Sequence, residues 1–217
     1  MSLSTPDDVL LALSRRYPET VVEPPYPVYI KGASRDHLPE FFRDLGFTKG
    51  AEIGVFKGVY SEQLCQGNPN LKLLCVDPYL KYPDFRDQID QKMFDEAKKE
   101  AEKRLAQYDC TFIRRMSTHA AQDIRDGSLD FIYIDGNHQF EFVVADLAAW
   151  IPKVRVGGII AGHDYKSIPN HPALTVVEAI DGWTRAYTVA PWFVLGRTKA
   201  KASEHRDKYR SWMWVQR

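Results

Sequence analysis

Short apolar runs alternate with amphipathic stretches along most of the chain. From residue 50 onward the runs have the length and composition of strands that are buried on both faces. We expect these strands at residues 51–55, 71–76, 111–113, 131–134 and 159–161, with two closing strands at residues 186–189 and 192–195. The last two have only a short connection, Ala190-Pro191, which predicts that they pair antiparallel.

The stretches between these runs have the spacing of amphipathic helices. One apolar stripe recurs every four residues, at Phe85, Ile89, Met93, Ala97, Ala101 and Leu105. A second follows the fourth strand, at Phe140, Val143, Val144, Leu147 and Ile151. Strands that alternate with helices form a parallel sheet covered on both faces. We therefore predict an α/β fold: a Rossmann-like, doubly wound, seven-stranded, mostly parallel sheet with an antiparallel last strand.

The two ends of the chain differ from this central part. Residues 1–48 read as an N-terminal helical cap, interrupted at residues 23–27, where three prolines exclude a regular helix. Residues 49–197 carry the alternating pattern and form the main domain. Residues 198–217 form a basic tail with two tryptophans. We expect this tail to pack on the body or on a second copy of the chain, as in a homodimer.

Composition narrows the classes of function. The 217 residues are enough for one sizeable core, and 44% of them are hydrophobic. Lys and Arg number 29, as do Asp and Glu, which argues against nucleic acid or an anionic membrane as the main partner. Three cysteines without a CxxC pair predict neither a disulfide framework nor a zinc site. No signal peptide or spanning apolar stretch is visible, so we expect a cytoplasmic protein.

Candidate chemistry gathers where two of the predicted strands end. The fourth runs into Asp135-Gly136-Asn137-His138, and the fifth into Gly162-His163-Asp164. Ligands of such sheets bind beyond the carboxyl ends of the strands, so both groups should contribute to one site. An imidazole with an ordinary pKa of about 6.5 suits proton transfer at neutral pH. His138, Asp135 and His163 are the candidate catalytic residues.

The first strand leads into a glycine turn, Glu52-Ile53-Gly54-Val55-Phe56-Lys57-Gly58. Dinucleotide binding needs G-x-G-x-x-G, so that the backbone can approach a pyrophosphate. Here Phe56 stands at the second glycine position, and the spacing is G-x-x-x-G. This pattern argues against NAD and leaves room for a ligand without a pyrophosphate.

Together these motifs resemble class I S-adenosylmethionine-dependent methyltransferases. The features are E-x-G-x-x-x-G after the first strand, the acid Asp77 after the second, and D-G-x-H after the fourth. The run IDGNHQFEFVVADLAAWIPKVRVGGIIAGHDY is similar to the methyltransferase-24 group, which includes small-molecule O-methyltransferases. The resemblance covers roughly residues 45–197. It implies methyl transfer from S-adenosylmethionine to a hydroxyl of a small molecule, such as a sugar, a phenol or a natural product.

The resemblance also implies roles for individual positions. Gly54 and Gly58 would lie under the methionine part of the cofactor, with the negative charge of Glu52 nearby. Asp77 would accept hydrogen bonds from the two ribose hydroxyls, and Met116 and Ser117 would lie at the adenine edge. Asp135 would face the methionine amino group, the transferred methyl group or a metal.

Two mechanisms fit these residues. In the first, His138 or His163 is a general base that acts directly on the hydroxyl. In the second, Asp135, His163 and Asp164 hold a divalent cation such as Mg²⁺, which lowers the pKa of the acceptor oxygen. Related metal-dependent enzymes carry an acid pair after the fifth strand, and His163 replaces one of these acids. Because His163 offers a nitrogen ligand, these three residues match a magnesium site made only of oxygen ligands less well.

Structural interpretations stand beside the functional ones. Gly54 and Gly58 could serve tight packing, and Asp77 before a proline could be a turn former. Ser117 could be a helix N-cap, Glu52 could pair with Lys57 or Arg114, and either histidine could bind backbone carbonyls.

Two other classes of protein are alternatives to a methyltransferase. The G-N-H element resembles calcineurin-like metallophosphoesterases, but their D-x-H and G-D-x-x-D motifs do not occur in this chain. The remaining alternative is a regulatory or scaffold domain that binds an adenosyl cofactor without turnover.

Overall fold

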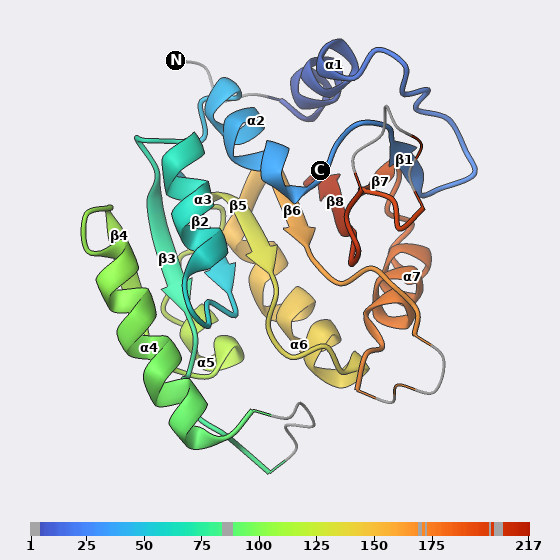
Figure 1. Ribbon diagram of the computed structural model, residues 1–217. Coiled ribbons are helices and arrows are strands. Elements are labelled where there is room, and N and C mark those ends of the chain that lie inside the picture. Colours follow the sequence, from blue (N-terminus) through green and yellow to red (C-terminus); the bar gives the residue numbers. More distant parts are fainter. Residues whose placement is uncertain (1–4, 84–88, 169–170, 172, 200, 202–205) are drawn as a thin grey trace.

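In the part of the chain that the structure describes, eight strands form a single sheet at the centre of the molecule (Figure 1). The structure is a computed structural model that describes residues 5–83, 89–168, 171, 173–199, 201 and 206–217. Phe85, the first position of the stripe expected before the third strand, lies outside the described residues. The strands are β1 Val28–Ile30, β2 Lys49–Ile53, β3 Lys72–Val76, β4 Cys110–Ile113, β5 Leu129–Ile134, β6 Val154–Gly162, β7 Trp192–Leu195 and β8 Ser211–Val215.

The sheet has the order β1-β7-β8-β6-β5-β2-β3-β4. Only β8 is antiparallel to its neighbours, since β1 pairs parallel with β7 and the remaining adjacent pairs are parallel. The predicted α/β class, the mostly parallel sheet and the antiparallel last strand are confirmed. None of the described helices is long and apolar enough to cross a membrane.

Helices cover both faces of the sheet (Figure 1). They are α1 Pro6–Arg16, η1 Arg35–His37, α2 Leu38–Asp44, α3 Val59–Gly67, α4 Gln91–Leu105, α5 Ser117–Ala121, α6 Phe140–Trp150, η2 Ile151–Lys153 and α7 Val176–Ala186. Successive strand residues point to opposite faces. Phe131 and Tyr133 pack with α1–α4, whereas Ile132 and Ile134 pack with α5–α7. Both stripes seen in the sequence contribute buried residues to these layers.

The predicted number of seven strands is wrong, because β1 and β8 come from the two terminal segments. In β8 all five residues are buried, among them Trp212 and Trp214, and the strand lies between β6 and β7. This apolar run has only five residues and follows a segment rich in charged residues, so the sequence pattern did not indicate a strand. β1 has three residues and pairs only at the edge of the sheet.

The strand expected at residues 186–189 is also wrong. The amphipathic helix α7 continues to Ala186, and the backbone N–H groups of Tyr187 and Val189 bond back to the carbonyls of Trp183 and Thr184. These bonds satisfy the end of a helix, so the N–H groups of Tyr187 and Val189 are not available to a neighbouring strand. The antiparallel partner of β7 is β8 instead.

β2 lies at the point where the order of the strands reverses. Its neighbours are β5 on one side and β3 on the other. Connections leave the carboxyl ends of β2 and β5 in opposite directions, which opens a crevice at this edge of the sheet.

Candidate active site

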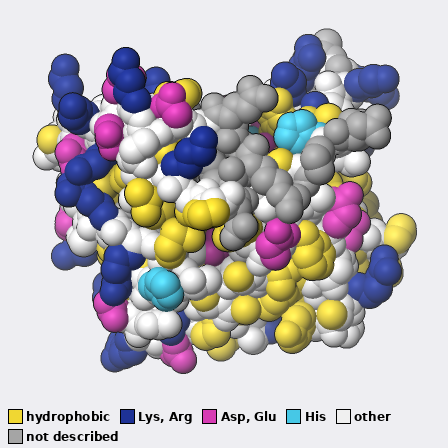
Figure 2. All heavy atoms as spheres, turned by 90° about the horizontal axis from the view of Figure 1, so that it is seen from below, with side chains coloured by type: hydrophobic (Ala, Val, Ile, Leu, Met, Phe, Trp, Pro, Cys, Tyr) yellow, Lys and Arg dark blue, Asp and Glu magenta, His cyan; other side chains and the backbone are white. Residues whose placement is uncertain are grey.

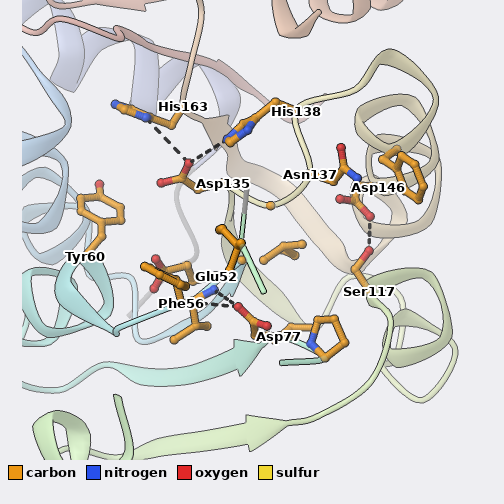
Figure 3. A pocket seen from close by; sticks show the side chains of 18 of the residues that line it. Glu52, Phe56, Tyr60, Asp77, Ser117, Asp135, Asn137, His138, Asp146 and His163 are labelled. Atoms are coloured by element: carbon orange, nitrogen blue, oxygen red, sulfur yellow. Dashed lines mark hydrogen bonds and ion pairs between the residues drawn. The ribbon is translucent and has the colours of Figure 1, made fainter. Parts of the chain in front are cut away.

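A pocket of about 440 Å³ lies at the carboxyl ends of β2, β3, β5 and β6 (Figure 3). Ligand sites in proteins commonly have about 300–1,000 Å³. The pocket is lined by Glu52, Gly54, Asp77, Met116, Ser117, Asp135, His138, His163 and Asp164. Of the predicted site residues only Gly58 is missing from this lining.

Gly54 lets the loop after β2 approach the loop after β5. Its φ is +90°, and a Cβ at this position would lie 2.2 Å from the carbonyl oxygen of Asp135. No side chain fits there, so glycine is required for packing as well as for conformation. Phe56 is a non-glycine residue with φ +46° beside it. Gly58 is the N-cap of α3 with φ +71°, and a Cβ at this position would contact Ala101 of α4.

Asp77 connects the loop after β3 to the glycine turn. Its Oδ2 accepts hydrogen bonds from the backbone N–H groups of Val55 and Phe56, at 3.0 and 2.9 Å. Its Oδ1 accepts one from the N–H of Tyr79 at 2.7 Å. Burial raises the pKa of Asp77 while these bonds oppose the shift. A carboxylate offers about four acceptor positions, so the one that remains is on Oδ1.

Glu52 is buried beneath the turn, with an exposed fraction of 1%. It accepts a hydrogen bond from the hydroxyl of Ser61. Burial raises the pKa of Glu52 well above its usual range, despite that bond. The alternative partners considered for it are occupied elsewhere, because Lys57 pairs with Glu100 and Arg114 with Glu102.

The histidines and aspartates at the ends of β5 and β6 form one cluster (Figure 3). β5 and β6 pair in parallel, with Ile134 opposite Gly162, so the residues that follow them meet. His138 Nε2 lies 2.9 Å from Asp164 Oδ2 and 4.0 Å from Asp135 Oδ1. His163 Nδ1 lies 3.3 Å from the same Asp164 oxygen and 3.8 Å from Asp135 Oδ1. The two strand ends therefore build a single charged group.

The surroundings of His163 favour its protonated form. Burial lowers the pKa of His163, but its contacts with the carboxylates of Asp164 and Asp207 outweigh burial and raise the pKa to about 9. His163 is therefore a cation at neutral pH and a poor base. Burial alone would raise the pKa of Asp164, yet the bonds from His138 and His163 hold it well below its usual range. Asp164 is an anion that faces both imidazoles.

Arg35 reaches the same cluster from the N-terminal segment. Its guanidinium lies 3.3 Å from Asp135 Oδ2 and stacks 5.1 Å from the ring centroid of Tyr60. The sequence interpretation did not include Arg35, because nothing in its local pattern indicates which part of the sheet the segment reaches.

Met116 and Ser117 line the pocket at the start of α5, beside Pro78. Ser117 makes no capping bond with its helix, and its hydroxyl donates to Asp146 Oδ1 of α6 (Figure 3). Burial raises the pKa of Asp146 to about 7 against the effect of this bond. Asp146 was also missed in the sequence. The sequence feature that could have indicated it is a single acidic residue within the apolar stripe that includes Val143 and Leu147.

Three of these side chains could bind a metal ion together. The ligand atoms of Asp135, His138 and Asp164 all lie within 4.8 Å of one another. The set differs from the one expected from the sequence, because His138 takes the place of His163. Two carboxylates and one imidazole suit a transition metal better than Mg²⁺, which prefers oxygen ligands.

Comparisons with known proteins identify a family for this chain. The family model described as "Methyltransferase domain" matches residues 51–165. The uncharacterized protein y4gI of Sinorhizobium fredii is 38% identical over 52 residues, which are 24% of this chain and 6% of that protein. The chain therefore spans a small part of that relative's length.

Solved structures of the same fold extend over nearly the whole chain. Cofactor-bound Rv0187 from MTB has a TM-score of 0.58 and 12% identity, covering 96% of this chain and 89% of that one. An O-methyltransferase from Bacillus cereus in complex with SAH has a TM-score of 0.56 and 14% identity, with coverage of 96% and 89%. At these identities the likeness shows a common fold.

Proposed function

The chain belongs to the methyltransferase domain family, and we propose that it methylates a hydroxyl of a small molecule with His138 as general base. In this proposal the methyl donor is S-adenosylmethionine, as expected for a class I methyltransferase; proteins of the same fold have been solved with SAH and with SAM. The observation that carries the proposal is the 2.9 Å contact between His138 Nε2 and Asp164 Oδ2 in the wall of the pocket.

We propose one orientation of the cofactor in the pocket. Gly54 packs the loop after β2 against the backbone of Asp135, and both residues line the pocket, where the carboxylate of Asp135 can accept from the methionine amino group. The remaining acceptor position on Asp77 Oδ1 supports a bond from one ribose hydroxyl, since backbone donors occupy the others. The adenine ring then extends toward Met116 and Ser117.

The bound cofactor supplies a methyl group on a sulfonium leaving group. The protein must orient the acceptor hydroxyl and remove its proton. His138 takes this proton, and Asp164 stabilises the imidazolium that forms. His163 is already protonated, so it contributes positive charge behind both aspartates. Arg35 balances Asp135 and belongs to the segment 1–48, which we propose covers the site.

A metal-assisted reaction is the second candidate, supported by the 4.8 Å cluster of Asp135, His138 and Asp164. These residues would hold the cation, which would bind the acceptor oxygen and lower its pKa. His138 cannot be a ligand and the base at the same time. The two mechanisms therefore predict opposite responses to a chelator.

Two aromatic side chains in the pocket wall favour a small ring-shaped acceptor. Tyr82 and Phe142 line the pocket with their ring centroids 5.6 Å apart, and Asn137 Nδ2 donates to the hydroxyl of Tyr82 at 2.8 Å. The surface seen in Figure 2 has basic side chains interspersed with acidic and apolar ones, whereas a nucleic-acid acceptor calls for a continuous basic field. A phenol or a sugar is our proposed acceptor class.

A panel of phenols and sugars, incubated with S-adenosylmethionine and assayed for S-adenosylhomocysteine, tests the proposal. For an accepted substrate, we expect His138→Gln to lower kcat by about 10²–10⁴-fold, the usual contribution of a general base. The matched control is His119→Gln, since His119 is exposed on α5 and lies outside the pocket. Affinity for S-adenosylhomocysteine should stay unchanged in both variants.

Three outcomes would contradict parts of the proposal. Full activity of His138→Gln would remove this residue from the mechanism. Loss of turnover in a chelator, with recovery on adding Mn²⁺ or Zn²⁺, would favour the metal-assisted reaction. Cofactor binding without turnover on any hydroxyl compound would favour a regulatory or scaffold role.

A further inference from the structure

Asp146 is a buried carboxyl group in the pocket wall that methyl transfer does not use. It lies on α6 with an exposed fraction of 6%, among apolar side chains such as Val143 and Leu147. A carboxyl group in such a place is costly unless something bonds to it. Its side chain lines the pocket at the end occupied by Met116 and Ser117.

The two oxygens of Asp146 have different surroundings. Oδ1 accepts the hydrogen bond from the hydroxyl of Ser117. Within the described part of the chain, no group donates to Oδ2. A Cβ placed on Gly136 would lie 3.9 Å from Oδ2, so this oxygen lies close to the loop after β5 (Figure 3). A buried acceptor with an open position therefore lines the ligand pocket.

The cofactor orientation brings a specific donor to this position. The orientation rests on the proposed function, in which Gly54 and Asp77 bind the methionine and ribose parts. The base then projects away from Asp77 toward Ser117 and Asp146. Adenine carries an exocyclic amino group on its outer edge, whereas hypoxanthine and guanine carry a carbonyl oxygen there. An ionised carboxylate is an acceptor only, so it matches the amino group and repels the carbonyl.

We propose that Asp146 Oδ2 accepts a hydrogen bond from the amino group of adenine and selects an adenosyl cofactor over its deaminated analogue. Ser117 orients the carboxyl group by donating to Oδ1. Asp146 thus determines base specificity, and it plays no part in moving the methyl group or the proton.

A purely structural role makes a different prediction. The Ser117–Asp146 bond also joins α5 to α6, so its loss could loosen the pocket as a whole. That effect would weaken every ligand to a similar extent. A change in the preference between two bases is expected only if Asp146 contacts the base.

The test compares binding of S-adenosylhomocysteine with binding of S-inosylhomocysteine by calorimetry. At about pH 8.5 the carboxyl group of Asp146 is ionised, because its pKa is about 7. We expect the wild type to prefer the adenosyl ligand by about 10- to 100-fold, the usual range for a hydrogen bond to a charged group. Asp146→Asn should abolish or invert this preference, since the amide can donate to the carbonyl of hypoxanthine.

The matched control is Asp123→Asn, an exposed aspartate that pairs with Arg115 on the surface. This variant should keep the wild-type preference. An unchanged preference in Asp146→Asn, with both affinities lowered together, would overturn the proposal in favour of a structural role. Equal affinity of the wild type for the two ligands would also overturn the proposal. This comparison uses the wild type alone, so it remains a test even if Asp146→Asn does not fold. Failure of the wild type to bind either ligand would instead contradict the proposed function.

Discussion

Replacing Asp77 by alanine tests how the pocket is built. The substitution removes the acceptor of three backbone N–H groups, those of Val55, Phe56 and Tyr79. The bonds join the loops after β2 and β3, so their loss affects the shape of the pocket before any ligand binds. It also removes the proposed contact with a ribose hydroxyl.

The magnitude follows from these bonds. A hydrogen bond to a charged group contributes about 1.5–3 kcal/mol, but the N–H of Phe56 borders the pocket and can bond to water instead. Removing the carboxyl group also removes the cost of burying it, which raises the pKa of Asp77, so we expect Asp77→Ala to lower the free energy of unfolding by about 2–4 kcal/mol. In a chain of this size the loss corresponds to a fall in Tm of about 5–15 °C. Loss of the ribose contact should weaken S-adenosylhomocysteine by at least about 10-fold.

Thermal unfolding and calorimetric titration measure the two effects separately. The control is Asp126→Ala, whose exposed side chain pairs with Lys153 outside the pocket. A Tm within about 1 °C of the wild type would refute the claim that Asp77 stabilises the glycine turn. A lower Tm with unchanged ligand affinity would agree with that claim and refute the ribose contact.

Two further predictions concern the charge cluster and the glycine turn. Since the pKa of His163 is about 9, against about 6.5 in an unfolded chain, its stabilisation is complete below about pH 6.5 and is lost as pH rises through 9. The difference in unfolding free energy between wild type and His163→Gln should therefore shrink by about 3 kcal/mol as the pH rises through this window; a constant difference would contradict the shift. Gly54→Ala should reduce cofactor affinity at least about 10-fold, because its Cβ would collide with Asp135. Gly127→Ala, with φ +64° and open space around it, is the control and should retain affinity.

The sequence predicted the centre of the sheet well, for physical reasons. Strands buried on both faces are continuous apolar runs, and parallel neighbours bring their carboxyl ends together. Asp135, His138, His163 and Asp164 could therefore be assigned to one place before their distances were known. The cluster depends on only one strand pairing, that of β5 with β6.

The parts that escaped prediction depend on contacts between distant segments. β8 is recognisable only from its place between β6 and β7, about 50 residues after the end of β6. Arg35 lines the pocket and pairs with Asp135, which lies 100 residues further along the chain. Asp146 faces the pocket from a helix whose other buried side chains are apolar. Gly58 satisfied the sequence motif, yet its positive φ serves the start of α3.

The structure of a complex with S-adenosylhomocysteine is the most direct test of the proposed site. We expect the ligand beyond the ends of β2 and β3, with its amino group at Asp135, a ribose hydroxyl at Asp77 Oδ1 and its base between Ser117 and Asp146. The sulfur should then face the side of the pocket that carries His138. A ligand bound elsewhere, or bound with its sulfur directed away from His138, would contradict the proposal.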